Sequence, residues 1–464
     1  MSPSPDDALP TRVADALRAA VSPDRVVTEG PGYDAAVAIW NGAVARRPGV
    51  VLRCADAADA QAGVRVAREL GMPLSVRGGG HDWAGRALVD GGLTLDVSGM
   101  REVTVSPDAA EATVAGGATA ADLANAAVDY GLSPVTGTGG TIGMVGLALG
   151  GGYGPLSGRC GLAVDNVLSV ELVLADGTLV TADAEHQPEL FWALRGGGGG
   201  NFGVVTSMRV RLHALPSLLS GLVLFPWEQA GSLLAALDDI VLDCPDDLTV
   251  QNGYVIGPDG DRVFFVIPTW SGAPAGGEAA IASITGLGTP LMAEVGPATV
   301  PHMLAGTDAL FPFGRHVQLR PRTVARLTTG VRAALLNAGE AFTSPLSAVS
   351  MHSLHGAPTR VPLADTAFGR RDPHLVIEAI AVWEADDPNP AAHGTWARGL
   401  SAGLAGEALP GGYPNLLGPD EHEQIADAFG ANTDRLLAAK ERFDPDGVFN
   451  AQPLPRRAAE PAVG

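Results

Sequence analysis

The sequence predicts an α+β protein built from two modules of different character. Between Val50 and about His213, short β-branched runs alternate with segments whose apolar residues recur at helical spacing, an alternation typical of mixed α/β architecture. After about Pro216 the glycine clusters become rarer, and prolines and separate strand-like pieces become more frequent. The chain has 464 residues, which exceeds one ordinary domain and is enough to enclose a large ligand.

The first module opens with a strand, a helix and a second strand. A strand is predicted at 50–52, and the helical spacing that follows ends at Gly71, where left-handed backbone is favoured. The next strand, 73–76, runs directly into a glycine turn. The later predicted elements are a strand at 111–115, a helix over 120–127 closed by Gly131, a hairpin over 168–180 around Asp176-Gly177, and a strand at 204–212.

The second module is predicted to be a sheet covered by helices. Its expected strands are 262–267 and 375–383, and its expected helices are 231–240 and 323–338. The last part of the chain carries the pattern of an amphipathic helix over 425–440. We expect residues 456–464 to be disordered.

Composition argues against several classes of partner. The 30 Lys and Arg against 51 Asp and Glu give a formal charge of -21, which repels nucleic acid and anionic lipid surfaces. The start of the chain lacks a basic, apolar leader, and no later stretch offers the ~20 uninterrupted apolar residues of a membrane span. We therefore expect a cytoplasmic protein. Cys54, Cys160 and Cys244 are too few and too scattered for a disulfide scaffold or a metal site.

Three glycine-rich turns, at 77–82, 136–154 and 195–203, mark the expected ligand site. Glycine loses the most conformational entropy on folding, so such clusters are costly unless the backbone must approach a ligand closely. The middle turn interleaves its glycines with Thr, Leu, Val and Ile, whereas a flexible linker would be more polar. Successive bare N–H groups can cradle the oxygens of a diphosphate. None of the turns has a Rossmann or Walker pattern, so the sequence predicts a phosphate binder of another kind.

These turns resemble a known family. The motifs that carry the resemblance are WNGAVARRPGVVLRC (40–54), RGGGH (77–81), GGGYG (150–154), GLAVDN (161–166), FWALRGGGGGNFGVVTS (191–207) and FDPDGVFN (443–450). Together they resemble the berberine bridge enzyme-like branch of the FAD-linked oxidases, within the vanillyl-alcohol oxidase and PCMH-type FAD-binding superfamily. The resemblance covers nearly the whole chain and is weakest between about residues 216 and 408.

The resemblance implies a PCMH-type FAD-binding domain of two α/β subdomains and a substrate domain with an antiparallel sheet covered by helices. The domain limits expected from it are an N-terminal helical segment (1–45), the FAD-binding domain (46–216), the substrate-binding domain (217–408), a C-terminal segment that returns to the FAD domain (409–455) and the tail (456–464). It also implies that FAD is covalently bound, because His81 stands where family members attach the flavin 8α-methyl group. A histidine that only forms hydrogen bonds within its loop is the alternative interpretation.

The attachment is expected to be single. Many relatives add a second link through a cysteine in the loop that corresponds to 132–137, where this chain has Ser133. We interpret Cys160 as an inert thiol. The residues expected to bind the cofactor, mostly through backbone groups, are Arg77, Gly78, Gly79, Gly80, His81, Asp82, Gly85, Ser133, Thr136, Gly137, Gly139, Gly140, Gly143, Gly146, Gly200, Asn201, Gly203, Val205, Asn415 and Asn450.

Candidate catalytic residues come from two segments of the second half of the chain. Tyr413 and Asn415 resemble a family motif, and their spacing would place both on one face of a strand; the aromatic residue that follows in the family is Leu416 here. His352 and His355 are further candidates, because imidazole titrates near neutral pH. The catalytic assignments are Tyr413 and His352, each with an ordinary packing role as the alternative.

The expected function is an oxidase that takes a hydride from a small organic substrate, such as a secondary metabolite, sugar, alcohol or amine, and passes electrons to O2 to give H2O2. A monooxygenase and a dehydrogenase with another acceptor stay open, because the motifs fix the cofactor and not the fate of its electrons. An inactive binding protein on the same fold is an alternative of another class. We expect a monomer or a homodimer.

Overall fold

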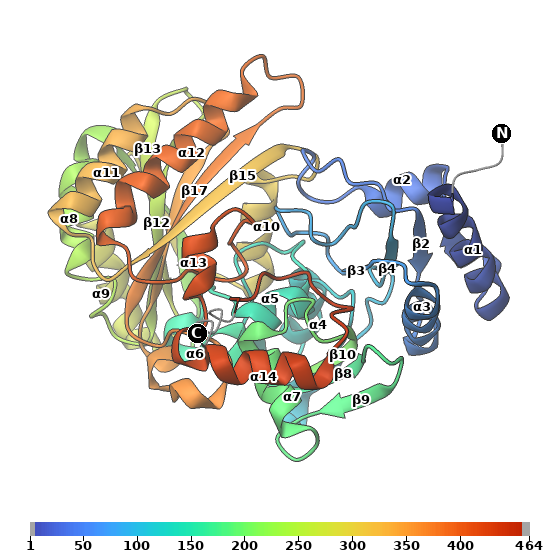
Figure 1. Cartoon of the computed structure of the whole chain (residues 1–464). Helices are drawn as coiled ribbons and strands as arrows, with labels where there is room; N and C mark the ends of the chain where they lie inside the picture. Colours follow the sequence, from blue (N-terminus) through green and yellow to red (C-terminus); the bar gives the residue numbers. More distant parts are fainter. Residues whose placement is uncertain (1–4, 457–464) are drawn as a thin grey trace, which may run out of the picture.

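The computed structural model describes residues 5–456 as three β-sheets with helices packed around them (Figure 1). The first two sheets are formed by residues 26–213, and the third by residues 219–383. Each sheet has its own large cluster of buried apolar side chains. Among the described residues, every helix is too short or too polar to cross a bilayer.

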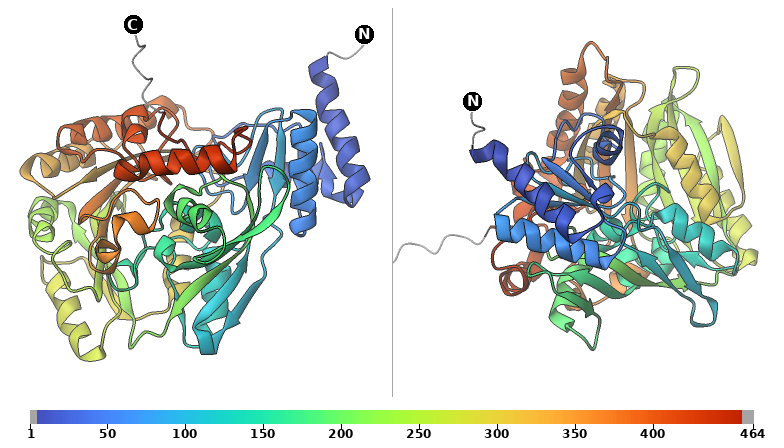
Figure 2. Two further views of the ribbon diagram at one scale, coloured as in Figure 1. Left: turned by 60° about the horizontal axis from the view of Figure 1, so that its bottom comes forward. Right: turned by 90° about the vertical axis from the view of Figure 1, so that its right-hand side faces the viewer.

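The first sheet is mainly parallel. Strands β2, β4 and β3 run parallel, and β1 pairs antiparallel to β2 at the edge. Helix α3 begins where the Asp56 side chain accepts a hydrogen bond from Asp59 N, and it ends at Gly71 with φ 69°, as predicted; α1 packs beside it (Figure 2). The elements are β1 (Val26–Val27), β2 (Val50–Arg53), β4 (Leu93–Asp96), β3 (Leu74–Arg77), α1 (Pro5–Ala20), α2 (Pro31–Val37) and α3 (Ala57–Leu70).

The second sheet is antiparallel, and the middle and third glycine turns lie between its elements. Its central strand β10 pairs with β6 on one side and β8 on the other. The predicted hairpin is confirmed, because β8 and β9 pair across Gly177, which has φ 80°. The elements are β5 (Val103–Ser106), β6 (Glu111–Ala115), β7 (Ser133–Pro134), β8 (Val167–Val173), β9 (Leu179–Ala182), β10 (Val204–His213), α4 (Ala120–Val128), α5 (Met144–Gly150), α6 (Ser157–Cys160) and α7 (Pro188–Gly197).

The third sheet has seven antiparallel strands in the order β14-β11-β13-β12-β16-β17-β15. Helices α8, α9, α11 and α12 cover its outer face (Figure 1), as predicted. The elements are β11 (Leu219–Pro226), β12 (Leu248–Ile256), β13 (Arg262–Trp270), β14 (Met292–Pro297), β15 (His316–Val324), β16 (Ala348–Leu354), β17 (His374–Trp383), α8 (Ala230–Asp238), α9 (Pro274–Thr285), α10 (Val300–Leu310), α11 (Thr329–Glu340) and α12 (Pro390–Leu404).

Alternate residues of the third sheet face two different environments. On β17, Leu375 and Ile377 belong to the core beneath the helices, whereas Glu378 and Ile380 face the other way. This is the two-residue period of a strand. The inner face of the sheet is therefore free to form one wall of a site.

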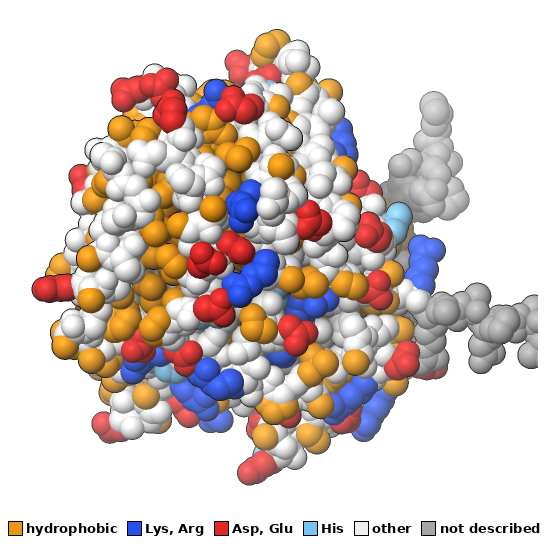
Figure 3. All heavy atoms as spheres, turned by 90° about the vertical axis from the view of Figure 1, so that its left-hand side faces the viewer, with side chains coloured by type: hydrophobic (Ala, Val, Ile, Leu, Met, Phe, Trp, Pro, Cys, Tyr) orange, Lys and Arg blue, Asp and Glu red, His pale blue; other side chains and the backbone are white. Residues whose placement is uncertain are grey.

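The helix-covered side of the third sheet is seen directly in Figure 3. Asp and Glu side chains are dispersed over this side among apolar and basic ones. On this side the acidic groups do not form a single patch, so the net charge of -21 is not concentrated here.

Two helices predicted from the sequence have different limits. The helix expected over 323–338 begins at Thr329, because Thr323 and Val324 extend β15 and the Thr328 side chain caps Val331 N at 3.2 Å. The helix expected over 425–440 is two helices, α13 (His422–Ala426) and α14 (Thr433–Phe443). They are separated by Gly430, whose φ of 49° is incompatible with a continuing right-handed helix.

The C-terminal segment crosses back to the second sheet. Helix α14 packs beside α7 (Figure 2), although more than two hundred residues separate the two helices in sequence. The domain limits given above stay a prediction. Of the tail expected to be disordered, all but Arg456 lies outside the described residues.

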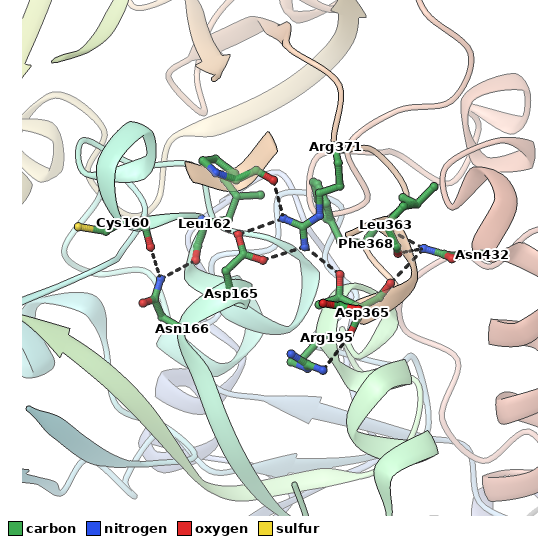
Figure 4. Close-up of polar contacts among 12 residues, drawn as sticks. Cys160, Leu162, Asp165, Asn166, Arg195, Leu363, Asp365, Phe368, Arg371 and Asn432 are labelled. Atoms are coloured by element: carbon green, nitrogen blue, oxygen red, sulfur yellow. Dashed lines mark hydrogen bonds and ion pairs between the residues drawn. The ribbon is translucent and has the colours of Figure 1, made fainter. Parts of the chain in front are cut away.

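A buried ion pair joins the two modules (Figure 4). Arg371 donates to both oxygens of Asp165, at 2.7 and 3.0 Å, and to Thr366 Oγ1 at 2.8 Å. Beside it, the Asn432 amide donates to the carbonyls of Leu363 and Thr366, both at 3.0 Å. The Arg371 and Asp165 side chains are only 6% and 8% exposed, so neither charge can be compensated by water if the other is removed.

Replacing Arg371 with methionine is therefore expected to destabilise the fold by about 3–5 kcal/mol, because Asp165 would stay buried without its partner. Urea unfolding of the whole chain measures this loss. The matched control is Arg360→Met: Arg360 and its partner Asp246 are 62% and 42% exposed, and such pairs contribute at most about 1 kcal/mol. Equal losses in the two variants would contradict the assigned role of the buried pair.

Candidate active site

One large cavity lies between the glycine turns and the inner face of the third sheet. Its volume is about 880 Å³, within the range of pockets that enclose a large organic ligand. One wall is formed by residues of the three glycine-rich turns, and the other by residues of β11, β12, β13, β16 and β17. Two sheets far apart in the sequence therefore share a single site.

The backbone wall is made by close contact between two of the turns. A Cβ atom on Gly79 would overlap the backbone nitrogen of Gly143, and one on Gly143 would lie 2.7 Å from Gly79 N. A Cβ on Gly146 would meet no other heavy atom within 4 Å, because this residue faces the open cavity. Any side chain at these positions would separate the turns or fill the space between them. At these three positions the wall can offer a ligand only backbone groups.

The His81 side chain projects from the end of the first turn and is fixed on three sides. Its Nε2 lies 2.9 Å from Thr141 Oγ1, the Trp40 ring stacks on it at 4.7 Å between centroids, and Phe313 packs edge-on at 5.6 Å. Burial lowers the pKa of His81 to about 4. The imidazole is therefore neutral at physiological pH and keeps a lone pair on one ring nitrogen.

The opposite wall is apolar except for a polar strip of four side chains: Gln251, Ser350, His352 and Glu378. Gln251 Nε2 donates to Ser350 Oγ at 3.0 Å, and Ser350 Oγ lies 3.2 Å from His352 Nε2. Glu378 Oε1 lies 3.5 Å from the same His352 nitrogen. Burial raises the pKa of Glu378 to about 8 and lowers that of His352 to about 4. Both groups are therefore largely neutral at neutral pH.

Glu378 is the least satisfied of the three carboxyl groups that line the cavity. Asp82 is paired with Arg86, and Asp308 accepts hydrogen bonds from Gly140 N and Thr141. In the described part of the chain, Glu378 has only the 3.5 Å approach of His352. A carboxyl group that is buried, weakly partnered and open to a cavity can exchange a proton with a ligand.

Tyr413 and Asn415 come together in a turn, not on a strand as the spacing predicted. Tyr413 Oη accepts hydrogen bonds from Gly152 N at 2.7 Å and from Asn415 Nδ2 at 2.9 Å. Burial raises the pKa of Tyr413 well above its ordinary value. The neutral phenol keeps its own proton and can donate it as a hydrogen bond into the cavity.

Most of the residues expected to bind a cofactor or to act in catalysis line this cavity. Those that do are Gly78, Gly79, Gly80, His81, Asp82, Gly137, Gly139, Gly143, Gly146, Gly200, Gly203, Val205, His352, Tyr413 and Asn415. Residues of all three glycine-rich turns therefore lie along the first wall, and their role in binding a cofactor stays a prediction.

Seven of the expected residues lie outside the lining: Arg77, Gly85, Ser133, Thr136, Gly140, Asn201 and Asn450. Three of them have internal partners instead, because Arg77 pairs with Asp96 at 3.1 Å, Thr136 Oγ1 donates to Gly137 O at 2.9 Å, and the Asn201 amide donates to Gly197 O at 3.2 Å. These residues support the turns from behind.

The other four residues lie outside the cavity lining, each for a different reason. Gly140 N donates to Asp308, and a Cβ on Gly85 would meet the Val44 side chain at 2.5 Å. Ser133 lies in β7 and pairs with the end of β10. Asn450 is exposed and bonds to Gly447 O in its own turn.

Two further side chains considered from the sequence are not part of the lining. His355 is buried, with Nε2 3.0 Å from Leu248 O and 3.4 Å from the Cys244 sulfur. Cys160 is half-buried, and burial raises the pKa of its thiol to about 11. Neither side chain can act on a ligand in this cavity from its present position.

The sequence reasoning missed Thr141, Asp308 and Glu378. Glu378 had a visible signal, because it is the one acidic residue within the apolar strand 375–383. Asp308 had none, since only the packing of α10 against α4 brings it to the middle glycine turn.

Comparisons with known proteins agree with this geometry. The family described as "FAD binding domain" matches residues 48–183, and the family "Berberine and berberine like" matches residues 412–453. The chain is 32% identical over 444 residues to (R)-6-hydroxynicotine oxidase of Paenarthrobacter nicotinovorans, covering 91% of this chain and 94% of that protein. It is 30% identical to the FAD-linked oxidoreductase aurO of Gibberella zeae, covering 95% and 86%.

A solved structure shows the same fold. The crystal structure of 6-hydroxy-D-nicotine oxidase from Arthrobacter nicotinovorans superposes with a TM-score of 0.84 at 29% identity, over 93% of this chain and 98% of that one. The residues present fit FAD, because the wall of bare backbone at Gly79, Gly143 and Gly146 suits a diphosphate that side chains would exclude. The chain is an enzyme of the berberine bridge enzyme-like family of FAD-linked oxidoreductases.

Proposed function

We propose that the protein is an oxidase that holds FAD through one covalent bond at His81 and oxidises a compact, largely apolar molecule at a hydroxyl or amine group. The observation that carries this proposal is the large cavity, with glycine-rich turns and a neutral His81 on one wall and an apolar sheet with one polar strip on the other. FAD, when bound, supplies a ring system that accepts a hydride from a substrate and passes the electrons to O2, giving H2O2.

The wall of the third sheet favours a substrate with few polar groups. Leu222, Leu224, Val263, Phe265 and Ile267 form much of its surface, and they would leave the hydroxyl groups of a sugar chain without partners. The four residues of the polar strip offer hydrogen-bond partners for one hydroxyl or amine group of a substrate. The name of the relative (R)-6-hydroxynicotine oxidase supplies a first probe of this chemical class.

Within the proposed reaction, Glu378 is the base. Its raised pKa of about 8 lets it accept a proton from a substrate hydroxyl or ammonium group near neutral pH. Tyr413 donates a hydrogen bond to the substrate, since its oxygen already accepts two. His352 stays neutral and, with Ser350, holds the polar strip in place.

The proposed covalent bond predicts the fate of the yellow colour after acid precipitation. In the wild type the colour should stay with the pellet, and in His81→Ala it should be released, because only His81 carries the bond. Cys160→Ser is the matched control and should keep its colour, since Cys160 lies outside the cavity lining. Colour retained by His81→Ala would contradict attachment at His81, and a colourless wild type would contradict the flavin itself.

The assignment of Glu378 as base predicts a pH dependence. The rate of substrate oxidation should rise with pH through about 8 as the carboxyl group ionises, and Glu378→Gln should lose about 10²-fold in rate and this dependence. Tyr413→Phe should be slower but keep the same pH profile. Stopped-flow flavin bleaching under nitrogen measures the rate, and an unchanged profile in Glu378→Gln would refute the assignment.

Glu378 also predicts a cost in stability that can be measured without a substrate. Its pKa is about 8 in the fold against an ordinary 4.5, so between these values the folded chain keeps a proton that the unfolded chain loses, and stability falls as pH rises. Glu378→Gln should therefore be more stable than the wild type at neutral pH by on the order of 2 kcal/mol. Equal unfolding free energies at every pH in this window would contradict the raised pKa.

Oxygen uptake with stoichiometric H2O2 tests the proposed acceptor. Turnover with a dye acceptor and without oxygen uptake would instead indicate a dehydrogenase. Oxygen uptake with incorporation of oxygen into the product would indicate a monooxygenase.

A further inference from the structure

The hydrogen bonds of His81 fix which of its two ring nitrogens is available. Nε2 lies 2.9 Å from Thr141 Oγ1, and Thr141 Oγ1 donates to Asp308 Oδ1 at 3.2 Å. Asp308 Oδ1 also accepts hydrogen bonds from Gly140 N at 2.9 Å and Thr141 N at 3.2 Å. His81, Thr141 and Asp308 are therefore connected by consecutive hydrogen bonds, from the imidazole to a carboxylate.

The carboxylate of Asp308 decides which atoms donate and which accept along the chain of hydrogen bonds from His81 through Thr141 to Asp308. Asp308 Oδ1 accepts the hydrogen bond from Thr141 Oγ1, so the single hydroxyl proton of Thr141 points to Asp308. The Thr141 oxygen then accepts a hydrogen bond, and its donor is His81 Nε2–H. Within residues 5–456, His81 Nδ1 has no hydrogen-bond partner, so its lone pair is free.

The ring is also prevented from turning. Trp40 stacks on one face with an interplanar angle of 19°, and Phe313 packs against it at 89°. Trp40 is itself held, because its Nε1 donates to Phe311 O at 2.9 Å. A 180° flip of the imidazole would place Cε1 where Nε2 now lies and would break the hydrogen bond to Thr141.

We propose that Thr141 and Asp308 are a proton relay for the covalent attachment of FAD: they hold His81 with Nδ1 free to form the bond, and Asp308 receives the Nε2 proton. This inference rests on the proposed function, since it presupposes attachment at His81. Both residues are positioning residues, because they act through His81. The lowered pKa of His81, about 4, keeps the attacking nitrogen unprotonated.

The attachment balances with O2 as oxidant. A bond forms between His81 Nδ1 and the 8α carbon of FAD, and one C–H bond of that carbon and the His81 Nε2–H bond are broken. The two electrons released reduce one O2, which takes up two protons and becomes H2O2. The proton from Nε2 travels through the Thr141 hydroxyl to Asp308, and from there to water.

Three variants separate the relay from simple packing. Thr141→Ser keeps the hydroxyl group, Thr141→Val replaces it by a methyl group of similar size, and Asp308→Asn keeps an oxygen for the backbone N–H groups but removes the base. Each purified full-length protein is incubated with excess FAD in air. Acid-stable flavin and the intact mass are followed with time, and total bound flavin is measured in the native protein.

Thr141→Ser is expected to attach FAD as the wild type does. Thr141→Val and Asp308→Asn are expected to bind FAD but to attach it about 10²-fold more slowly. Their attachment should speed up as pH rises, because hydroxide must take the proton that Asp308 no longer receives.

Three other results would contradict the proposed relay. Attachment at the wild-type rate in Thr141→Val overturns the relay and leaves the link at His81 intact. Loss of all flavin binding in Thr141→Val, with Thr141→Ser normal, also overturns it, since the hydroxyl would then serve binding. Acid-soluble flavin in the wild type itself contradicts the covalent link of the proposed function, and the relay falls with it.

Discussion

The backbone of Gly79 packs directly against that of Gly143, and the geometry of the site follows from this contact. A Cβ on Gly143 would lie 2.7 Å from Gly79 N, so neither position tolerates a side chain. His81 and Thr141 each stand two residues from the contact, which is why Nε2 and Oγ1 meet at 2.9 Å. The same approach leaves Gly79, Gly143 and Gly146 without side chains along the cavity. The glycine wall and His81, the proposed attachment residue, are thus parts of one packing arrangement.

The opposite wall meets a different constraint. Because the third sheet is apolar on both faces, its few polar side chains are desolvated. Burial raises the pKa of Glu378 and lowers the pKa of His352, so both side chains favour their neutral forms. A carboxyl group in this position destabilises the fold at neutral pH and is at the same time suited to proton transfer there. The burial that lowers the stability of the fold at Glu378 is therefore the same burial that suits this side chain to proton transfer.

Local patterns predicted the elements well, and long-range packing limited what could be predicted of the site. The C-cap at Gly71 and the hairpin at Gly177 are local features and were predicted correctly. The middle glycine-rich turn was only partly correct, because residues Met144–Gly150 within it form helix α5. The start of α11 was misplaced, because strand pairing of β15 overrides helical spacing at Thr323. Asp308 could not be found, since only tertiary packing brings α10 to the middle turn. Glu378 could have been found, as a charged residue inside an apolar strand.

The walls of the cavity are joined by contacts between distant parts of the chain. Asn41 Nδ2 donates to Val317 O across 276 residues, and Gly152 N donates to Tyr413 Oη across 261. During synthesis from the N-terminus, the glycine turns are complete long before Tyr413 leaves the ribosome. Such long loops are slow to close. The cavity therefore stays open to water until the C-terminal segment has docked, and its closure is among the last events of folding.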